Sequence, residues 1–400
     1  MIDRVNVTSF FSENIKAALK NDPPGEWMPN LPENIIRLSS GYPTPDLMPV
    51  DEMKDAVASL FEEEKDLPLH YLGSPKMDKL REQIQQRLLE RGIDVSDKEL
   101  LVTSGACQAI DLIARILIDE ETVVMTESPT YMEALEIFKN YTQHFMTIPL
   151  DQDGIQTDVL EDMLAERKRK KLTLPRFLYT IPTFQNPTGT TLSQERREHL
   201  LKLASIYNFL ILEDDAYGEL SFHSSPRPLK AMDKENRVLH VGSLSKVVSP
   251  GMRVGWVACD PEFINALFWF KKDLDHSFSQ ASMASFLEKV DYQNRLSVLR
   301  ETYRVKCDVL LSALQQYLPK SVSWYVPDGG YFVWVKISGV DTGELLEKAL
   351  DEGVSYIPGK FFFLEKQEGS EYLRLSFSYE GEMEIREGIK KLGKVVKSFM

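Results

Sequence analysis

A lysine, two serines and an arginine fall within eleven residues of one another, as Ser243, Ser245, Lys246 and Arg253. A lysine amine can form a Schiff base with an aldehyde, whereas hydroxyls and a guanidinium suit a phosphate dianion. An aldehyde and a phosphate on one small molecule describe pyridoxal 5'-phosphate (PLP), which stabilises carbanions. A segment of this kind is more often a surface loop with a solvated lysine, so the prediction depends on what accompanies it.

Two loops that follow apolar, strand-like runs carry side chains suited to the rest of such a cofactor. Three acids, Glu213, Asp214 and Asp215, follow the run 210–212, and ligands bind at the carboxyl ends of strands in open α/β sheets. A carboxylate against the pyridine nitrogen would keep it protonated, and Tyr217 could donate to the phenolic oxygen. Asn186, held extended by Pro187, could bind the same oxygen. A solvated acidic turn and a plain turn are the alternatives.

Three weaker candidates complete the set. The turn at 104–109 leads into a helix, whose first amides attract anions, although such turns are common. Tyr131 could lay its ring on the pyridine or simply pack. Arg374 alternates with apolar residues on a predicted strand, and burying it unpaired is unfavourable. A carboxylate partner is therefore implied, which is either a ligand or a protein acid.

Short β-rich runs alternate with helical stretches over the first three quarters of the chain, which predicts an α/β fold with a mostly parallel sheet covered on both faces. The predicted strands are 100–103, 122–125, 177–181, 210–212 and 238–241, with helices from Ala106 and over 193–207. Helices at 295–318, 342–352 and 382–400 and strands at 331–337, 354–357 and 373–377 predict a smaller α+β domain. We expect an arm at 1–50, a large domain at 51–290 and a small domain at 291–400.

The composition narrows the function further. Sixty-one acidic residues against 47 basic ones give a formal charge of −14, which disfavours a nucleic-acid partner. No apolar run is long enough for a membrane span, and the first residues lack the pattern of a signal peptide. Three scattered cysteines predict no disulfide framework, and the six histidines show no metal-ligand spacing. We expect a reduced, cytoplasmic protein without a metal.

Taken together, these segments resemble the fold-type I PLP-dependent aminotransferases of class I/II. The resemblance is to the branch that holds 2-aminoadipate and kynurenine aminotransferases and the aminotransferase part of MocR-type regulators. It spans nearly the whole chain, and the joint order of the motifs is specific. The matching segments are Gly41-Tyr42-Pro43, Thr103-Ser104-Gly105, Ser128-Pro129-Thr130-Tyr131, Pro182-Thr183-Phe184-Gln185-Asn186-Pro187-Thr188-Gly189, Glu213-Asp214-Asp215-Ala216-Tyr217, Gly242-Ser243-Leu244-Ser245-Lys246, Pro250-Gly251-Met252-Arg253, Gly329-Gly330-Tyr331-Phe332 and Leu373-Arg374-Leu375-Ser376.

The resemblance implies a seven-stranded type of sheet and a role for each candidate residue. Lys246 would form the Schiff base and then move the proton between Cα and C4', while Asp214 and Tyr217 complete the catalytic group. The remaining cofactor contacts implied are Ala106, Cys107, Tyr131, Asn186, Ser243, Ser245 and Arg253. The substrate would meet Gly41, Tyr71, Asn186 and Arg374, with Arg374 taking the α-carboxylate and Tyr71 reaching across a homodimer interface.

The chain departs from the family's pattern in three places. Ala106 and Cys107 stand where Ser-Gln is usual, so the phosphate would depend more on the serines and the arginine. Lys76 and Asp78 replace a glycine and a proline after Tyr71. The arm at 20–35 is longer than usual, and Lys16 occupies the place of an arginine that binds acidic side chains in some relatives.

The function implied is reversible, ping-pong amino transfer between an L-α-amino acid and a 2-oxo acid, with 2-oxoglutarate and glutamate as one pair. A PLP lyase acting by β- or γ-elimination would use the same cofactor cradle. A PLP-sensing regulator is disfavoured because the resemblance starts near the first residues and the chain is acidic. Aromatic clusters at 268–270 and 361–363 could line a substrate pocket or pack in the core.

Overall fold

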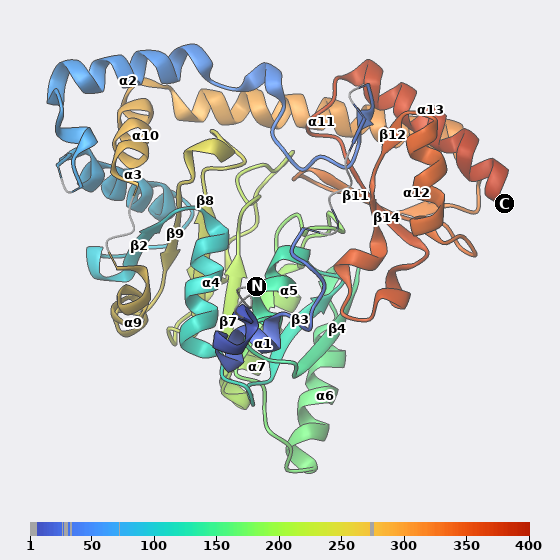
Figure 1. Cartoon of the computed structure of the whole chain (residues 1–400), viewed down its shortest axis with the longest axis horizontal. Helices are drawn as coiled ribbons and strands as arrows, with labels where there is room; N and C mark the ends of the chain where they lie inside the picture. Colours follow the sequence, from blue (N-terminus) through green and yellow to red (C-terminus); the bar gives the residue numbers. More distant parts are fainter. Residues whose placement is uncertain (1–5, 26, 28–30, 33, 72, 273–275) are drawn as a thin grey trace, which may run out of the picture.

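The structure of the chain is a computed structural model that describes residues 6–25, 27, 31–32, 34–71, 73–272 and 276–400. Its largest element is an eight-stranded sheet in the order β2-β9-β8-β7-β6-β3-β4-β5. The strands are β2 (Leu100–Thr103), β9 (Gly255–Ala258), β8 (Val238–Ser243), β7 (Leu210–Asp214), β6 (Phe177–Thr180), β3 (Val124–Ser128), β4 (Phe145–Asp151) and β5 (Gly154–Ile155). The sheet extends from the left of the molecule, where β2, β9 and β8 lie, down to β3 and β4 below its centre in Figure 1.

The predicted α/β fold with a mostly parallel sheet is confirmed. Strands β8, β7, β6, β3 and β4 run parallel to one another. Strand β9 is antiparallel to both β2 and β8. The eighth strand, β5, is a two-residue return from β4 through a turn in which Gly154 has φ of +87°. That turn requires a residue that tolerates positive φ, and it adds one short edge strand to the seven expected.

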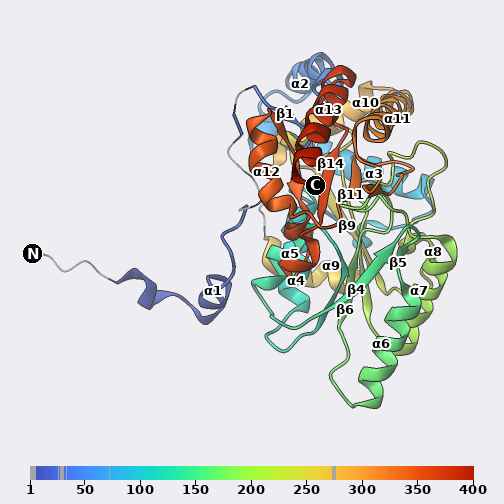
Figure 2. The same cartoon turned by 90° about the vertical axis from the view of Figure 1, so that its right-hand side faces the viewer.

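Helices cover both faces of this sheet, as Figure 2 shows. One face carries α4 (Ala106–Leu117), α5 (Met132–Lys139) and α9 (Pro261–Lys271), and the other carries α6 (Thr157–Arg169), α7 (Gln194–Tyr207) and α8 (Leu229–Met232). Side chains of one strand alternate between the two cores, so that Leu178 and Ile211 face α7 while Tyr179 and Leu212 face α4. The same alternation places neighbouring acids at the end of β7 on opposite faces of the sheet.

A second, antiparallel sheet is formed by the last quarter of the chain, seen at the right of Figure 1. Its strands are β10 (Ser323–Trp324), β11 (Phe332–Lys336), β14 (Tyr372–Ser376) and β13 (Ile357–Pro358), with helices α11 (Tyr292–Tyr317), α12 (Thr342–Asp351) and α13 (Glu382–Phe399). Strand β1 (Ile36–Arg37) pairs in parallel with β12 (Val354–Ser355), which returns the early chain to this region. The boundaries 1–50, 51–290 and 291–400 stay a prediction.

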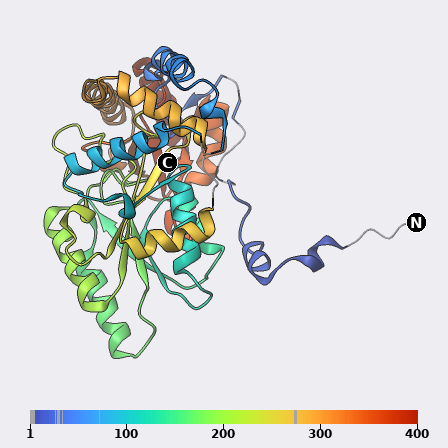
Figure 3. The same ribbon diagram turned by 90° about the vertical axis from the view of Figure 1, so that its left-hand side faces the viewer.

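Helices also form where none is predicted. They are α5, α6, α8 and α9 on the large sheet, together with α2 (Val50–Glu64), α3 (Lys76–Glu90) and α10 (Ser277–Lys289). The remaining short elements are α1 (Glu13–Ala18) and the 3-10 turns η1 (Val7–Phe10), η2 (Pro45–Leu47), η3 (Leu67–Leu69), η4 (Asp97–Glu99), η5 (Pro250–Met252), η6 (Gly359–Phe362) and η7 (Lys366–Gly369). Elements η1 and α1 extend away from the rest of the chain (Figures 2 and 3). Among the described residues, no helix is both long and apolar enough to cross a bilayer.

Candidate active site

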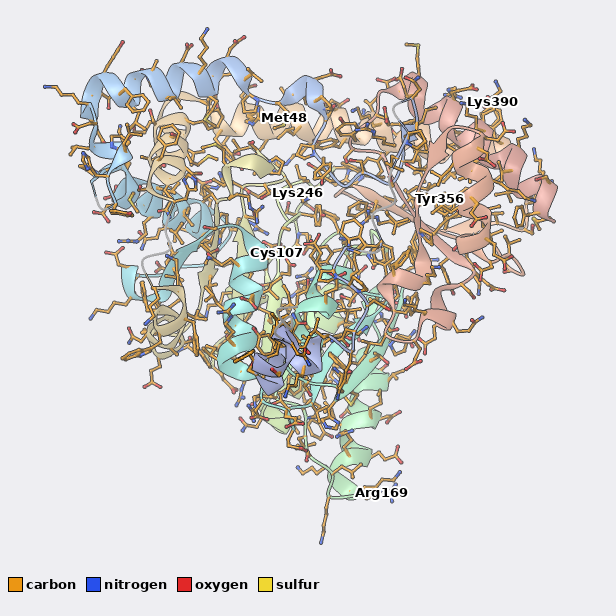
Figure 4. The ribbon with its side chains drawn as sticks, viewed as in Figure 1. Met48, Cys107, Arg169, Lys246, Tyr356 and Lys390 are labelled. Carbon is orange, nitrogen blue, oxygen red and sulfur yellow. The ribbon has the colours of Figure 1, made fainter. Side chains whose placement is uncertain are left out.

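A cavity of about 470 Å³ opens where the large sheet, the second sheet and the early chain meet. It lies beside the carboxyl ends of β6, β7 and β8, where an open α/β sheet binds its ligands. Figure 4 shows Lys246 near the centre of the molecule, with Cys107 at the start of α4 below it. The predicted site residues that line this cavity are Gly41, Ala106, Cys107, Tyr131, Asn186, Asp214, Tyr217, Ser243, Ser245, Lys246, Arg253 and Arg374.

Tyr71 is the one predicted site residue that this cavity does not include. Its side chain is 92% exposed in the single chain, next to η3. Lys16, on the extended α1, does not line the cavity either. The roles suggested for these two residues therefore need a surface that the single chain does not provide.

Lys246 follows β8, and hydrogen bonds hold both its backbone and its side-chain amine. Its carbonyl accepts a hydrogen bond from the Tyr331 hydroxyl at 2.7 Å, and its Nζ donates to the Gly41 carbonyl at 3.0 Å. Burial, followed by the positive charge of Arg374, lowers the pKa of Lys246 to about 8. About a fifth of this amine is therefore neutral at pH 7.4, far more than for an ordinary lysine, and both nucleophilic attack and proton abstraction require the neutral form.

The lowered pKa gives a pH dependence that can be measured on cofactor-free protein. Only the neutral amine attacks an aldehyde, so we expect the rate of PLP attachment to rise with pH and to be half-maximal near pH 8. Replacing Arg374 by methionine removes a neighbouring positive charge and moves this midpoint upward. Stopped-flow absorbance checks both, and a wild-type midpoint near the ordinary lysine pKa of 10.5 would contradict the assignment.

The end of the cavity suited to a phosphate combines hydroxyls, a guanidinium and the start of α4. The Ser243 hydroxyl donates to the Ser245 hydroxyl at 2.8 Å and accepts from the Ser245 amide at 3.0 Å. Arg253 Nη2 donates to the Ser104 carbonyl at 3.1 Å, beside Gly105 with φ of +90°. A Cβ at Gly105 would lie 2.4 Å from Arg253 Nη2, so only glycine lets the helix start approach the arginine.

Of the three consecutive acids at the end of β7, only Asp214 faces the cavity. Its Oδ2 accepts a hydrogen bond from the Tyr179 hydroxyl at 2.8 Å, and burial raises its pKa to about 6. Glu213 lies on the opposite face, where it accepts from the Leu229 and Lys230 amides and His240. Because side chains alternate along the strand, Asp214 lies on the cavity side and Glu213 does not.

Asp214 Oδ1 is buried and finds no hydrogen-bond partner in the part of the chain that the structure describes. A buried carboxylate oxygen without a partner is unfavourable, so a ligand that donates a proton there would stabilise the site. The protonated ring nitrogen of PLP is such a donor. The donor set therefore fits PLP at one end through Asp214 and at the other through Ser243, Ser245 and Arg253.

Arg374 lies on β14 with its guanidinium almost fully buried. Nη1 donates to Asn186 Oδ1 at 2.9 Å, Nη2 donates to the Ser39 carbonyl at 2.9 Å, and the Phe332 ring lies 4.2 Å from the guanidinium carbon. Burial lowers its pKa to about 10. No Asp or Glu within the described residues lies at ion-pair distance from it, and its Nε is buried without a partner. The carboxylate expected from the sequence is thus not a protein acid of the described chain.

Sequence reasoning missed several residues that line the cavity or hold its lining. Tyr179, which positions Asp214, was hidden inside a strand that reads as ordinary core. Two charged residues, Arg37 and Glu133, also line the cavity. Neither predicted aromatic cluster lines this cavity. Phe268 and Trp269 are exposed on α9, whereas Phe361 and Phe363, in and just after η6, line a separate cavity of about 970 Å³ beside α5.

Comparison with known proteins gives a family match over most of the chain. The description "Aminotransferase class I and II" matches residues 33–392. Aromatic-amino-acid aminotransferase 1 of Thermococcus litoralis is 38% identical over 373 residues, which are 92% of this chain and 89% of that protein. The 2-aminoadipate transaminase of Thermus thermophilus is 34% identical over 373 residues, 92% and 91% of the two chains.

Solved structures give the same match in three dimensions. The multiple substrate aminotransferase of Thermococcus profundus superposes with a TM-score of 0.90 at 34% identity, covering 99% of both chains. The kynurenine aminotransferase of Pyrococcus horikoshii, solved in complex with PMP, gives 0.87 at 33% identity, covering 98% of both. The HTH-type regulator YisV of Bacillus subtilis is 32% identical over 97% of this chain and 78% of its own length.

Proposed function

Because the chain belongs to the class I and II aminotransferases, whose cofactor is PLP, we propose that it transfers the amino group of an L-α-amino acid to a 2-oxo acid, with glutamate and 2-oxoglutarate as one pair. The observation that carries this proposal is the cavity itself. It brings together a lysine of lowered pKa, an arginine and an aspartate; within the described chain, the arginine has no protein carboxylate and one aspartate oxygen has no hydrogen-bond partner. The lysine suits the aldehyde of PLP, the arginine suits the α-carboxylate of a substrate, and the aspartate suits the pyridine nitrogen.

Each end of the cofactor has its own set of residues in this proposal. Ser243, Ser245 and Arg253, with the amides at the start of α4, hold the phosphate. Asp214 holds the ring nitrogen, Tyr131 stacks on the ring, and Asn186 Nδ2 and the Tyr217 hydroxyl bind the phenolic oxygen. Asn186 is suited to this because Arg374 occupies its Oδ1 and leaves the amide nitrogen to donate. When bound, PLP supplies an aldehyde that reacts with amines and a ring that accepts the electron pair left at Cα.

Lys246 is the proton carrier of the proposed reaction. Its neutral Nζ takes the proton from the substrate Cα and returns it at C4', which a pKa of about 8 allows in both directions. Arg374 and Gly41 orient the substrate by its α-carboxylate, because two of the guanidinium nitrogens are already fixed by Asn186 and Ser39. A carboxylate that approaches Nε meets an immobile, dehydrated cation.

The test of amino transfer is a half-reaction without any 2-oxo acid. Incubating the PLP-loaded enzyme with an amino acid alone is expected to give pyridoxamine phosphate and oxo acid in amounts equal to the enzyme sites. Adding 2-oxoglutarate is expected to restore the original absorbance. Continuous release of ammonia in the first step would instead indicate elimination and would overturn the proposal.

We further propose that two chains form a homodimer with shared active sites. Tyr71 supports this because it is 92% exposed and outside its own cavity, which is unfavourable for an aromatic ring unless another surface covers it. The extended η1 and α1 carry exposed Val7, Phe10 and Ile15 and present a second surface of that kind. In a dimer, Tyr71 would enter the cavity of the other subunit.

A further inference from the structure

Two side chains of opposite charge line the active-site cavity and have no part in the proposed transfer. Arg37 comes from β1 and Glu133 from the first turn of α5, so that they enter the cavity from different parts of the fold. Both are half-buried. Neither occurs in the motifs by which the sequence predicts the site.

Glu133 acts on the reacting groups through its charge. Its Oε2 accepts a weak hydrogen bond from the Cys107 thiol at 3.3 Å. Burial is the largest cause of the raised pKa of Tyr131 and of Cys107, and the negative charge of Glu133 raises both further. The same charge opposes the lowering of the pKa of Lys246. In the part of the chain that the structure describes, no lysine or arginine lies within ion-pair distance of this carboxylate. Its remaining oxygen lone pairs are open to a donor from the cavity.

The backbone of Arg37 is anchored by a hydrogen bond, whereas its guanidinium has no partner among the described residues. Its amide donates to Glu380 Oε1 at 2.7 Å, which anchors β1. The neighbouring Ile36 packs against α13, where a Cβ at Gly388 would lie 2.9 Å from Ile36 Cγ2. Alternation along a strand turns Arg37 away from α13 and toward the cavity. Its guanidinium makes no hydrogen bond or ion pair with any residue that the structure describes.

Among the described residues, neither half-buried charge has an ion-pair partner, which is unfavourable between the apolar walls formed by Leu31, Met132 and Ile357. A ligand that pairs with either charge relieves this penalty. An enzyme that alternates between two amino donors must accept two different side chains in one cavity. Two separate charges meet that need, because each stabilises one kind of side chain and leaves the other without a partner.

Building on the proposed amino transfer, we propose that Arg37 and Glu133 are two specificity-determining residues for two substrate classes. Arg37 binds the distal carboxylate of an acidic substrate such as glutamate or 2-oxoglutarate, in a geometry that a guanidinium favours. Glu133 accepts a hydrogen bond from a neutral side chain that carries a distal donor, such as a phenol, an indole or an amine on an aromatic ring. It also repels a second carboxylate.

The test measures single-turnover kcat/KM for glutamate, tyrosine and phenylalanine in the wild type and in the variants Arg37→Met and Glu133→Gln. Arg37→Met is expected to lower the value for glutamate about ten- to a hundredfold and to leave tyrosine within about twofold. Glu133→Gln is expected to lower the tyrosine to phenylalanine ratio about tenfold and to raise the value for glutamate. Phenylalanine is the matched control, because it lacks only the donor.

Changes in kcat/KM that differ between glutamate and tyrosine distinguish a role in specificity from a structural defect. Equal losses for all three amino acids in either variant would overturn the proposal, since a structural defect has no preference among them. Should a variant not fold, the unaltered enzyme still decides: it is expected to favour tyrosine over phenylalanine and glutamate over glutamine, and the absence of both preferences would contradict the inference. Failure of the amino transfer itself differs, because the wild type would then form no pyridoxamine phosphate with any amino acid.

Discussion

Replacing Lys246 by alanine is expected to lower turnover by about a thousandfold or more and to remove the visible absorbance of covalently bound cofactor. Alanine has no amine to attack the aldehyde and no group to move the proton at Cα. No other lysine lines the cavity among the described residues, so no neighbour can take over. Steady-state assays and an absorbance spectrum of the purified variant measure both effects.

A suitable control for this variant is added primary amine. Methylamine can restore part of the proton transfer if the missing amine is the only defect, whereas it cannot repair a misfolded cavity. Equilibrium dialysis measures whether the variant still binds PLP without covalent attachment. Binding would show that the phosphate site formed by Ser243, Ser245 and Arg253 is intact. A variant that kept wild-type turnover would contradict the role of Lys246.

The second large effect is expected for Asp214→Asn, with a loss of about a hundred- to ten-thousandfold in kcat/KM. The substitution keeps the shape but removes the negative charge beside the ring nitrogen, and losing one partner of a buried charge pair costs about 3–5 kcal/mol. A neutral amide next to the ring nitrogen favours the unprotonated pyridine, a weaker electron acceptor. Single-turnover kinetics and the pH dependence of the bound cofactor's absorbance measure the change.

Tyr179→Phe provides the matched control for Asp214. It removes the hydrogen bond to Oδ2 at 2.8 Å and keeps the carboxylate itself. Because a hydrogen bond to a charged group contributes about 1.5–3 kcal/mol, the expected loss is smaller, about tenfold or somewhat more. An Asp214→Asn variant within threefold of the wild type would show that the ring nitrogen has another partner.

The regular parts of the fold were predictable because their patterns are local. The β-rich runs at 177–181, 210–212 and 238–241 became β6, β7 and β8 within two residues at each end, and the helix at 193–207 became α7. These strands are buried on both faces, so that uninterrupted apolar runs mark them. The resemblance to class I/II aminotransferases of the 2-aminoadipate and kynurenine branch is confirmed by the family match and by the solved relatives.

Helix α10 shows why other parts could not be predicted. Most of its buried residues are serines and alanines, such as Ser282 and Ser285, and the Ser285 hydroxyl donates to the Ala56 carbonyl at 2.9 Å. Buried polar residues of this kind erase the apolar period by which a helix is recognised. Only the arrival of α2 and α3 from far along the chain makes their burial favourable.

The motif residues of the site were predictable, but their surroundings were not. The resemblance singled out Asp214 among the three acids, and the structure adds the physical reason, which is that the strand places Asp214 and Glu213 on opposite faces. Tyr179, Arg37 and Glu133 lie outside the family's motifs, and nothing local indicates that β6, β1 and α5 converge on one cavity. Tyr71 was predicted from the resemblance alone, and the role proposed for it depends on a second chain.

The most direct test of the whole account is the site at which the cofactor attaches. Treating the PLP-loaded enzyme with borohydride fixes the attachment, and digestion followed by mass spectrometry locates it. The account predicts one phosphopyridoxyl group per chain on the peptide that contains Lys246, and none in the Lys246→Ala variant. A cofactor fixed to another lysine, or a Lys246 that stays unmodified in the loaded enzyme, would contradict it.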